Sequence, residues 1–237
     1  MSHGGRHPAA GLRQRIRARL DVDDLLGALR LQEALVTSAP NDSGALNDLG
    51  STLAKLGSFV RARAVFEQAV ALAPAAPLAR TNLASVLFHS GEPDAAIALL
   101  ERTVRDCPTC VQAHAALGTA FRERGDAARA VAALRAATAL APNDAQLSFS
   151  LGRALLDARD GDGALALARD LQGARLGHAG AIALETLALM SIGDAPALSW
   201  LVDHERFVRV LRIGGDVAAF NAALAAHVAS HPTLMEA

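Results

Sequence analysis

A single spacing of 34 residues recurs along this chain in four different residue types. Prolines, glycines, leucines and alanines each form a series with that period, and a glycine or alanine follows every leucine of the series. The series are Pro40, Pro74, Pro108 and Pro142; Gly57, Gly91 and Gly125; Leu49, Leu83, Leu117 and Leu151; and Ala62, Ala96, Ala130 and Ala164. Self-similarity at a fixed period of this length is typical of chains that stack one supersecondary unit on the next.

One unit, residues 43–76, has the pattern of a helical hairpin. Leu46, Leu49 and Leu53 are spaced i, i+3 and i+7, which predicts an apolar stripe on a first helix. Gly57 follows this stripe and can take the left-handed conformation that ends many helices. A second apolar face comes next, and Pro74 stops it because proline cannot continue a helix interior. The members of this second face are Ala62, Val65, Phe66, Ala69 and Val70.

Small residues in this unit predict that its two helices approach closely. Gly50 lies on the first helix, and Ala62 and Ala69 lie on the second. Leu53 and Phe66 are expected to fill the space beside them. Each unit is therefore predicted to be an antiparallel helical hairpin.

The unit resembles the tetratricopeptide repeat, a helix–turn–helix of the same length that closes on a proline. The residues that carry the resemblance are Leu49-Gly50, Ala62, Phe66, Ala69 and Pro74; Leu83-Ala84, Ala96, Leu100 and Pro108; and Leu117-Gly118, Ala130, Leu134, Ala137 and Pro142. Thr103 departs from the family's alanine, and Arg80, His114 and Ser148 stand where the family often has tryptophan. The resemblance covers about residues 9–177 and implies an all-α, right-handed α-solenoid.

The repeat divides the chain into a leader, an array and a tail. Residues 1–8 are expected to be a basic flexible leader, and residues 9–42 a degenerate N-terminal repeat or cap. Full repeats are expected at 43–76, 77–110 and 111–144, a degenerate fourth repeat at 145–177, and a small C-terminal helical cap at 178–237. Residues 206–213 alternate charged and apolar side chains, which predicts one short strand within this cap.

Composition and charge exclude several classes of protein. Ala (54 residues) and Leu (36) dominate, which favours helices over an all-β fold. The formal net charge of −1 argues against a broad nucleic-acid surface. No apolar stretch is long enough for a membrane span and no secretory signal is present, so we expect a cytoplasmic protein. Residues 1–20 carry five arginines and no acid, which predicts either an electrostatic arm or a solvated tail that leads into a cap helix.

The family resemblance implies a concave face lined by the first helix of each repeat. Its groove residues would be Asn47, Asp48, Ser51, Asn82, Ser85, His89, Thr119, Arg122, Arg153 and Asp157. Asn and Ser side chains can bond the backbone of an extended peptide, and the two arginines could hold an acidic group. The alternative is that these are solvent-facing polar positions. Members of the family that clamp a C-terminal carboxylate carry basic residues where Asn47 and Ala116 stand, so a chaperone-tail clamp is not expected.

Three motifs suggest chemistry, and each has a simpler structural interpretation. Cys107 and Cys110 form a C-x-x-C in an expected turn without a further metal ligand nearby, although a metal or redox role is the alternative. A relaxed dinucleotide fingerprint, 161–166, is predicted to fill the turn between the helices of the fourth repeat. His227 and His231 lack the glutamate of a zinc-protease motif. We therefore predict no enzymatic activity, no cofactor and no metal.

The tail carries a second resemblance. Residues 200–208 and 219–227 are similar to a junction in bacterial proteins that join tetratricopeptide repeats to a 2-oxoglutarate/Fe(II) oxygenase domain. None of the eight histidines has Asp or Glu two positions later, as the iron site of that domain requires.

Two hypotheses follow from these resemblances. The first is an adaptor that binds a peptide or a partner protein on its concave face. The second is the substrate-recruiting or regulatory portion of an oxygenase whose catalytic domain is absent from this chain. In either case the array could form a homodimer through an end repeat or through the strand at 206–213, since an unpaired strand is an open edge.

Overall fold

The computed structural model of this protein describes residues 8–174 and 178–194, and these ranges contain eleven α-helices and no strand. The predicted strand at 206–213, the two tail histidines and both segments of the oxygenase resemblance lie outside the described residues. The helices are α1 (Pro8–Asp21), α2 (Leu25–Ser38), α3 (Ser43–Lys55), α4 (Phe59–Leu72), α5 (Pro77–His89), α6 (Pro93–Asp106), α7 (Val111–Glu123), α8 (Ala127–Leu140), α9 (Ala145–Asp157), α10 (Gly161–Gly173) and α11 (His178–Ile192).

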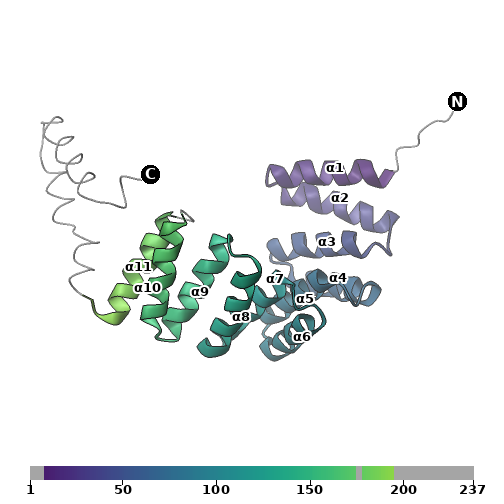
Figure 1. Cartoon of the computed structure of the whole chain (residues 1–237). Coiled ribbons are helices and arrows are strands. Elements are labelled where there is room, and N and C mark those ends of the chain that lie inside the picture. Colours follow the sequence, from purple (N-terminus) through teal and green to yellow (C-terminus); the bar gives the residue numbers. More distant parts are fainter. Residues whose placement is uncertain (1–7, 175–177, 195–237) are drawn as a thin grey trace, which may run out of the picture.

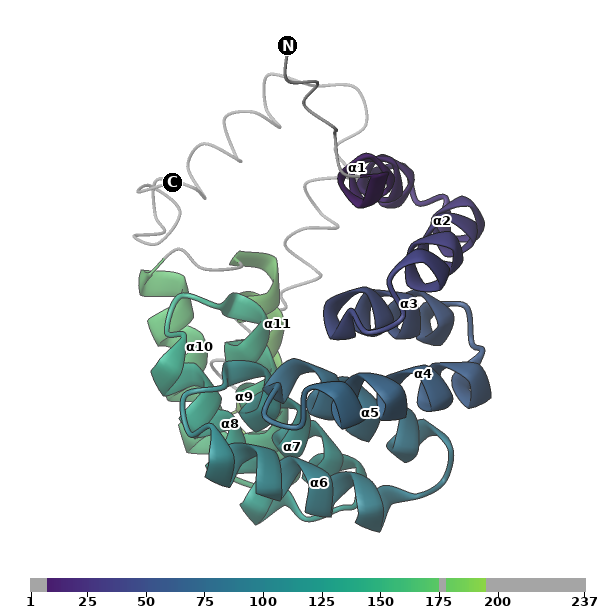
Figure 2. The same ribbon diagram turned by 90° about the vertical axis from the view of Figure 1, so that its right-hand side faces the viewer.

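The helices pack in chain order as a row of antiparallel hairpins (Figure 1). From α3 onward, each odd-numbered helix also contacts the next odd-numbered helix, whereas no such contact joins successive even-numbered helices in the described part of the chain. This asymmetry curves the row, and Figure 2 shows α3 and α11 toward the inside of the curve with α4 and α10 on its outer side. The predicted all-α solenoid is confirmed.

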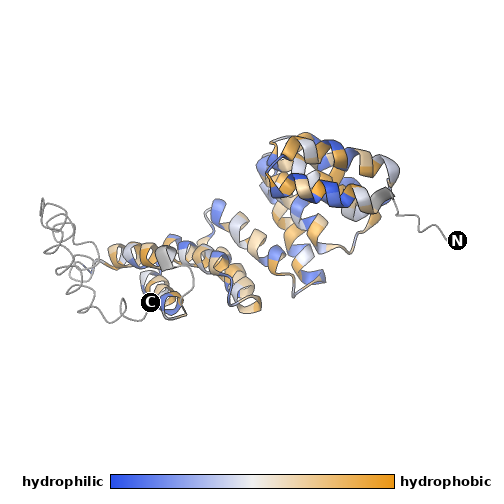
Figure 3. Ribbon diagram, turned by 90° about the horizontal axis from the view of Figure 1, so that it is seen from above, coloured by the Kyte–Doolittle hydropathy of each residue, from blue (hydrophilic) through white to orange (hydrophobic). Residues whose placement is uncertain are grey.

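The periodic alanines and leucines form the core between helices. Ala28, Ala62, Ala96, Ala130 and Ala164 are all completely buried. The four periodic leucines retain only 6–8 % of their surface. Hydrophobic and hydrophilic residues are interleaved along the helices and not divided among them, as Figure 3 shows. One cluster of buried residues runs from Leu49 on α3 to Leu189 on α11, as stacked repeats require, while Ile16, Leu35 and Ala45 form a separate cluster where α1, α2 and α3 meet.

Close approach of the paired helices depends on the small residue after each periodic leucine. A Cβ atom at Gly50 would lie 2.7 Å from the Phe66 ring, and one at Gly118 would lie 2.5 Å from Leu134. Phe66 is 1 % exposed and fills the space beside Gly50, as the sequence predicted. The packing therefore leaves no room for a Cβ atom at position 50 of α3 or at position 118 of α7.

The turn inside each hairpin has a left-handed residue at the repeat spacing. Gly57, Gly91 and Gly125 have φ of +74°, +84° and +78°, which confirms the predicted helix-ending role at Gly57. The same spacing continues in both directions to three further left-handed positions, Asp23, Arg159 and Gly193. The conformation therefore belongs to the repeat geometry and persists where glycine is absent.

Two segments differ from their sequence-based assignment. The relaxed fingerprint at 161–166 does not fill a turn, because Gly161 is the first residue of α10 and the Asp160 carboxylate accepts a hydrogen bond from the Gly163 N–H. Residues 178–194, assigned to a separate cap, continue the repeat register: α11 packs on α9 and α10, and the left-handed Gly193 follows its last residue.

The positions that replace the family's tryptophan are polar, and each of these side chains finds a local partner. Arg80 is 3 % exposed and pairs with Asp106. The His114 ring lies 2.9 Å from the carbonyl of Pro108, and the Ser148 hydroxyl donates to the carbonyl of Asp144. Arg80 and Ser148 are buried, and their partners matter because an unpaired buried polar group is costly; Arg80 Nε has no partner among the described residues.

Candidate functional site

A row of polar side chains runs along the odd-numbered helices at the repeat spacing. It begins on α1 and continues over α3, α5, α7 and α9, with one residue on each helix. The row consists of Arg17, Ser51, Ser85, Thr119 and Arg153, of which all but the partly buried Ser51 are exposed. Four of the five were predicted from the sequence. Arg17 was missed, although it lies one period before Ser51 and the same spacing would have found it.

Three of the predicted groove residues form a hydrogen-bonded cluster between α3 and α5. The Asn82 amide nitrogen donates to Asn47 Oδ1 at 2.9 Å and to Ser51 Oγ at 3.4 Å. Asn47 retains only 9 % of its surface, so its amide is engaged by the fold and is not free for a partner. Asn82 is left with its carbonyl oxygen as an acceptor, because both of its donor hydrogens are used.

Asp48 lies at the edge of a hollow of about 380 Å³ between α1 and α3. Removal of water from its surroundings raises the pKa of the Asp48 carboxyl, while Arg13 and the Asn47 amide oppose that rise. The buried Gln32 lines the same hollow; its amide nitrogen donates to the Asp48 carbonyl at 3.3 Å, but its Oε1 has no partner among the described residues. Gln32 is thus a site residue that the repeat pattern did not indicate.

Ser85 and His89 on α5 also contact each other through the backbone. His89 Nδ1 lies 2.7 Å from the Ser85 carbonyl, which can only accept, so Nδ1 carries the hydrogen. The His89 ring stacks on Phe59 at 5.3 Å between centroids. His89 is therefore held in place, with Nε2 as its remaining polar atom.

Arg122 and Arg153 have different surroundings. Arg122 forms an ion pair with Asp157 at 3.6 Å, which joins α7 to α9, whereas Arg153 has no ion-pair partner in the described ranges. The Thr119 hydroxyl donates to the Ala115 carbonyl within its own helix and keeps its acceptor capacity. The predicted pair of free arginines is thus one free arginine and one that is already paired.

The two cysteines lie close together in the chain, between two helices. Cys107 follows the last residue of α6 and Cys110 precedes α7, so both lie in the predicted turn as free thiols. None of the helices in residues 8–174 and 178–194 combines the length and apolar character needed to cross a bilayer.

Comparison with known proteins supports the repeat architecture. Among curated protein sequences, none matches this chain. Several solved structures share its fold at low identity. PilW, a widely conserved type IV pilus biogenesis factor, aligns with a TM-score of 0.71 and 18 % identity over 96 % of this chain and 97 % of its own.

Two other solved structures show the same likeness over about three quarters of the chain. The thermophilic TPR protein TTC0263 from Thermus thermophilus gives a TM-score of 0.63 with 22 % identity, covering 75 % of this chain and 99 % of its own. YrrB, a TPR protein with an unusual peptide-binding site, gives 0.51 with 19 % identity, covering 75 % and 88 %.

The sequence profile of the tetratricopeptide repeat matches three stretches, 13–77, 47–109 and 115–179, which together cover well over half of the chain. These matches coincide with the hairpins α1 to α10 and with the periodic core that joins them. The chain belongs to the tetratricopeptide repeat family.

Proposed function

We propose that this protein is an interaction scaffold that binds a peptide or partner protein along the inner face of its odd-numbered helices. The observation that carries the proposal is the polar row Arg17, Ser51, Ser85, Thr119 and Arg153, which follows the repeat spacing across five helices. The core between the helices consists mainly of alanine and leucine, whereas four of the five side chains in this row are polar and exposed. YrrB is described as having a peptide-binding site, which makes the same role reasonable here.

The groups available to a partner differ from those that the sequence suggested. Asn82 offers one carbonyl acceptor and Ser85 offers a hydroxyl for which no hydrogen bond is formed within the described residues. Arg17 and Arg153 bound the row at its two ends as cations without a carboxylate partner in the same ranges. This arrangement suits an extended segment with backbone groups over the hydroxyls and an acidic group at an end.

The test selects binding peptides and then blocks one face at a time. Peptides selected from a random library are measured by calorimetry against wild type, against Ser85→Arg/Thr119→Arg, and against Ala98→Arg/Ala132→Arg. The control pair lies exposed on the even-numbered helices α6 and α8. We expect micromolar affinity, about −8 kcal/mol, which the inner-face variant loses and the control retains. Equal binding to both variants would show that the inner face is not the site.

The second hypothesis, a recruiting portion of an oxygenase, rests on residues 200–208 and 219–227, which lie outside the described ranges. No observation on the described helices favours it, so the scaffold is the function that we propose.

A further inference from the structure

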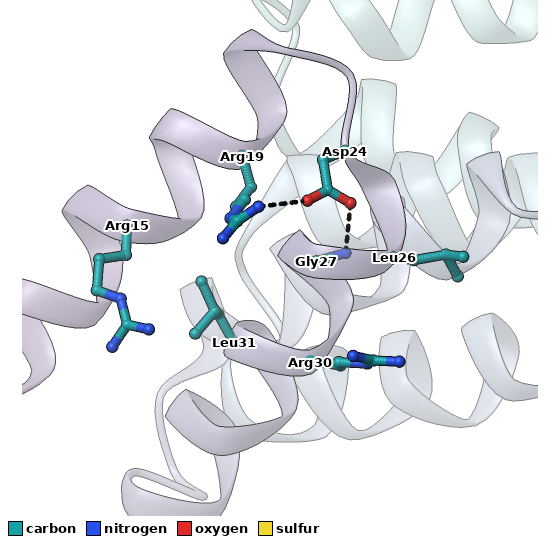
Figure 4. Close-up of a pocket in the computed structure, with 7 residues that line it drawn as sticks. All are labelled: Arg15, Arg19, Asp24, Leu26, Gly27, Arg30 and Leu31. Atoms are coloured by element: carbon teal, nitrogen blue, oxygen red, sulfur yellow. Dashed lines mark hydrogen bonds and ion pairs between the residues drawn. The ribbon is translucent and has the colours of Figure 1, made fainter.

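The N-terminal repeat, which consists of α1 and α2, has a cationic hollow on the side of α1 that faces away from the polar row. Its volume is about 310 Å³, and it is lined by residues of α1, α2 and the turn between them (Figure 4). Arg15 and Arg19 project from α1 into the space where Leu31 lies, and Leu26 and Arg30 extend from α2. Arg15 and Arg17 are two residues apart, which places them on nearly opposite faces of the helix. The hollow is therefore separate from the polar row.

Positive charge exceeds negative charge in this hollow. Arg19 pairs with Asp24 at 2.8 Å, and the same carboxylate caps α2 by accepting from the Gly27 N–H at 2.8 Å. Asp24 is thus occupied by the fold. In the part of the chain that the structure describes, no carboxylate pairs with Arg15 or Arg30. Three guanidinium groups therefore line the hollow together with one carboxylate that is already engaged, Arg15 and Arg19 on one side of α2 and Arg30 on the other (Figure 4).

The hollow also offers apolar contact. Leu26 lines it and is 62 % exposed, and Leu31 lies partly buried beside the arginines. Guanidinium groups beside exposed leucine suit a ligand that carries both carboxylates and an apolar side chain, because arginine forms paired hydrogen bonds with carboxylates.

We propose that this hollow binds an acidic peptide segment of a partner protein, with carboxylates on Arg15 and Arg30 and separate apolar side chains against Leu26 and Leu31. A membrane surface or a long nucleic acid fits less well, because the exposed Asp21 and Asp23 border the same turn and would oppose an extended anionic surface. A short segment covers the hollow without reaching those carboxylates. The proposal does not depend on the inner face.

The experiment measures fluorescence anisotropy of a short labelled peptide of glutamates with interspersed leucines. A matched peptide with glutamine in place of glutamate provides the uncharged comparison. Arg15→Glu/Arg30→Glu is compared with Arg105→Glu/Arg159→Glu, which makes the same change of net charge at exposed arginines of later repeats. The inner-face variant Ser85→Arg/Thr119→Arg is measured alongside, and it is expected to bind the acidic peptide as wild type does.

We expect the Arg15→Glu/Arg30→Glu variant to bind about tenfold more weakly, since each reversal removes an attraction and adds a repulsion that salt screens. The glutamine peptide should also bind wild type more weakly, because it lacks the charges that the arginines attract. The control should stay within about twofold of wild type. If circular dichroism shows that the glutamate variant is unfolded, Arg15→Gln/Arg30→Gln replaces it, with a smaller loss expected. The proposal is overturned if the folded Arg15/Arg30 variant binds the acidic peptide as tightly as wild type does, or if wild type does not bind this peptide. It is also overturned if wild type binds only phosphatidylserine vesicles or single-stranded DNA, which are measured in the same way.

Discussion

Replacement of Gly50 by alanine tests whether the paired helices are as close as the structure places them. A Cβ atom there would lie 2.7 Å from Phe66 Cε1 and 2.8 Å from both Cδ1 and Cζ. These separations are well inside van der Waals contact for carbon atoms. The ring is 1 % exposed and packed on all sides, so it cannot move away without disturbing the core.

Two opposing contributions set the expected change in the free energy of unfolding. Overpacking a core costs about 1–3 kcal/mol, whereas alanine in place of glycine inside a helix returns about 1 kcal/mol. Gly11 is the matched control, because it also lies inside a helix but a Cβ there meets no atom within 4 Å. Gly11→Ala should therefore stabilise by up to about 1 kcal/mol, and the difference between the two variants isolates the packing cost.

Urea denaturation followed by far-ultraviolet circular dichroism measures both variants. We expect the midpoint to fall for Gly50→Ala and to rise for Gly11→Ala. Phe66→Leu opens space at the same contact, so Gly50→Ala should cost less in that background, with a coupling of about 1 kcal/mol or more. If Gly50→Ala stabilises the protein as Gly11→Ala does, the close approach of α3 and α4 through Phe66 is wrong.

Four further changes probe other parts of the array. Arg159→Gly should stabilise the protein against urea by up to about 1 kcal/mol, because Arg159 has φ of +60° and only glycine takes this conformation without cost. Gln32→Met should stabilise the protein by about 1 kcal/mol, because it removes the buried Oε1 that lacks a partner among the described residues. Calorimetry would detect this gain, and Gln32→Glu should not show it. Burial raises the pKa of Asp48, so the folded state binds more protons than the unfolded state and stability falls as pH rises through that pKa. Asp48→Asn should therefore raise the melting temperature at about pH 7 but not at about pH 3, and an equal rise at both would contradict the assignment. Asp106→Asn should destabilise the protein more than Arg80→Met does, because Asp106→Asn leaves the buried Arg80 guanidinium without its counter-charge, whereas Arg80→Met removes the guanidinium itself. The reverse order of melting temperatures would refute this prediction.

The fold was predictable because the same physical constraint recurs in every repeat. Alanine at the completely buried positions 62, 96, 130 and 164 leaves space for the neighbouring helix, and this requirement repeats wherever two hairpins stack. Glycine at 57, 91 and 125 meets the left-handed turn in the same way. Constraints of this kind produce a period that can be read without coordinates.

The 34-residue spacing fails to predict the structure where a different residue type occupies a repeated position. Arg159 and Asp23 adopt the left-handed turn without glycine, so no residue pattern indicated that the turn geometry extends to them. The register of α11 was missed for a related reason: its helix is apolar on most sides and lacks the stripe that marks the earlier repeats. At these positions the left-handed backbone geometry persists although the residue pattern does not.

The candidate site could be located from the sequence, but the state of its side chains could not. The 34-residue spacing puts Ser51, Ser85, Thr119 and Arg153 at equivalent positions of successive odd-numbered helices. Asn47 and Asn82, however, are 35 residues apart and meet diagonally across α3 and α5, so each becomes the other's partner. Arg122 likewise meets Asp157. Such pairings depend on how far neighbouring helices are rotated, which a period does not encode. The groups that bond across repeats are engaged by the fold, and the groups left over, such as Ser85 and Arg153, are those that we propose a partner engages.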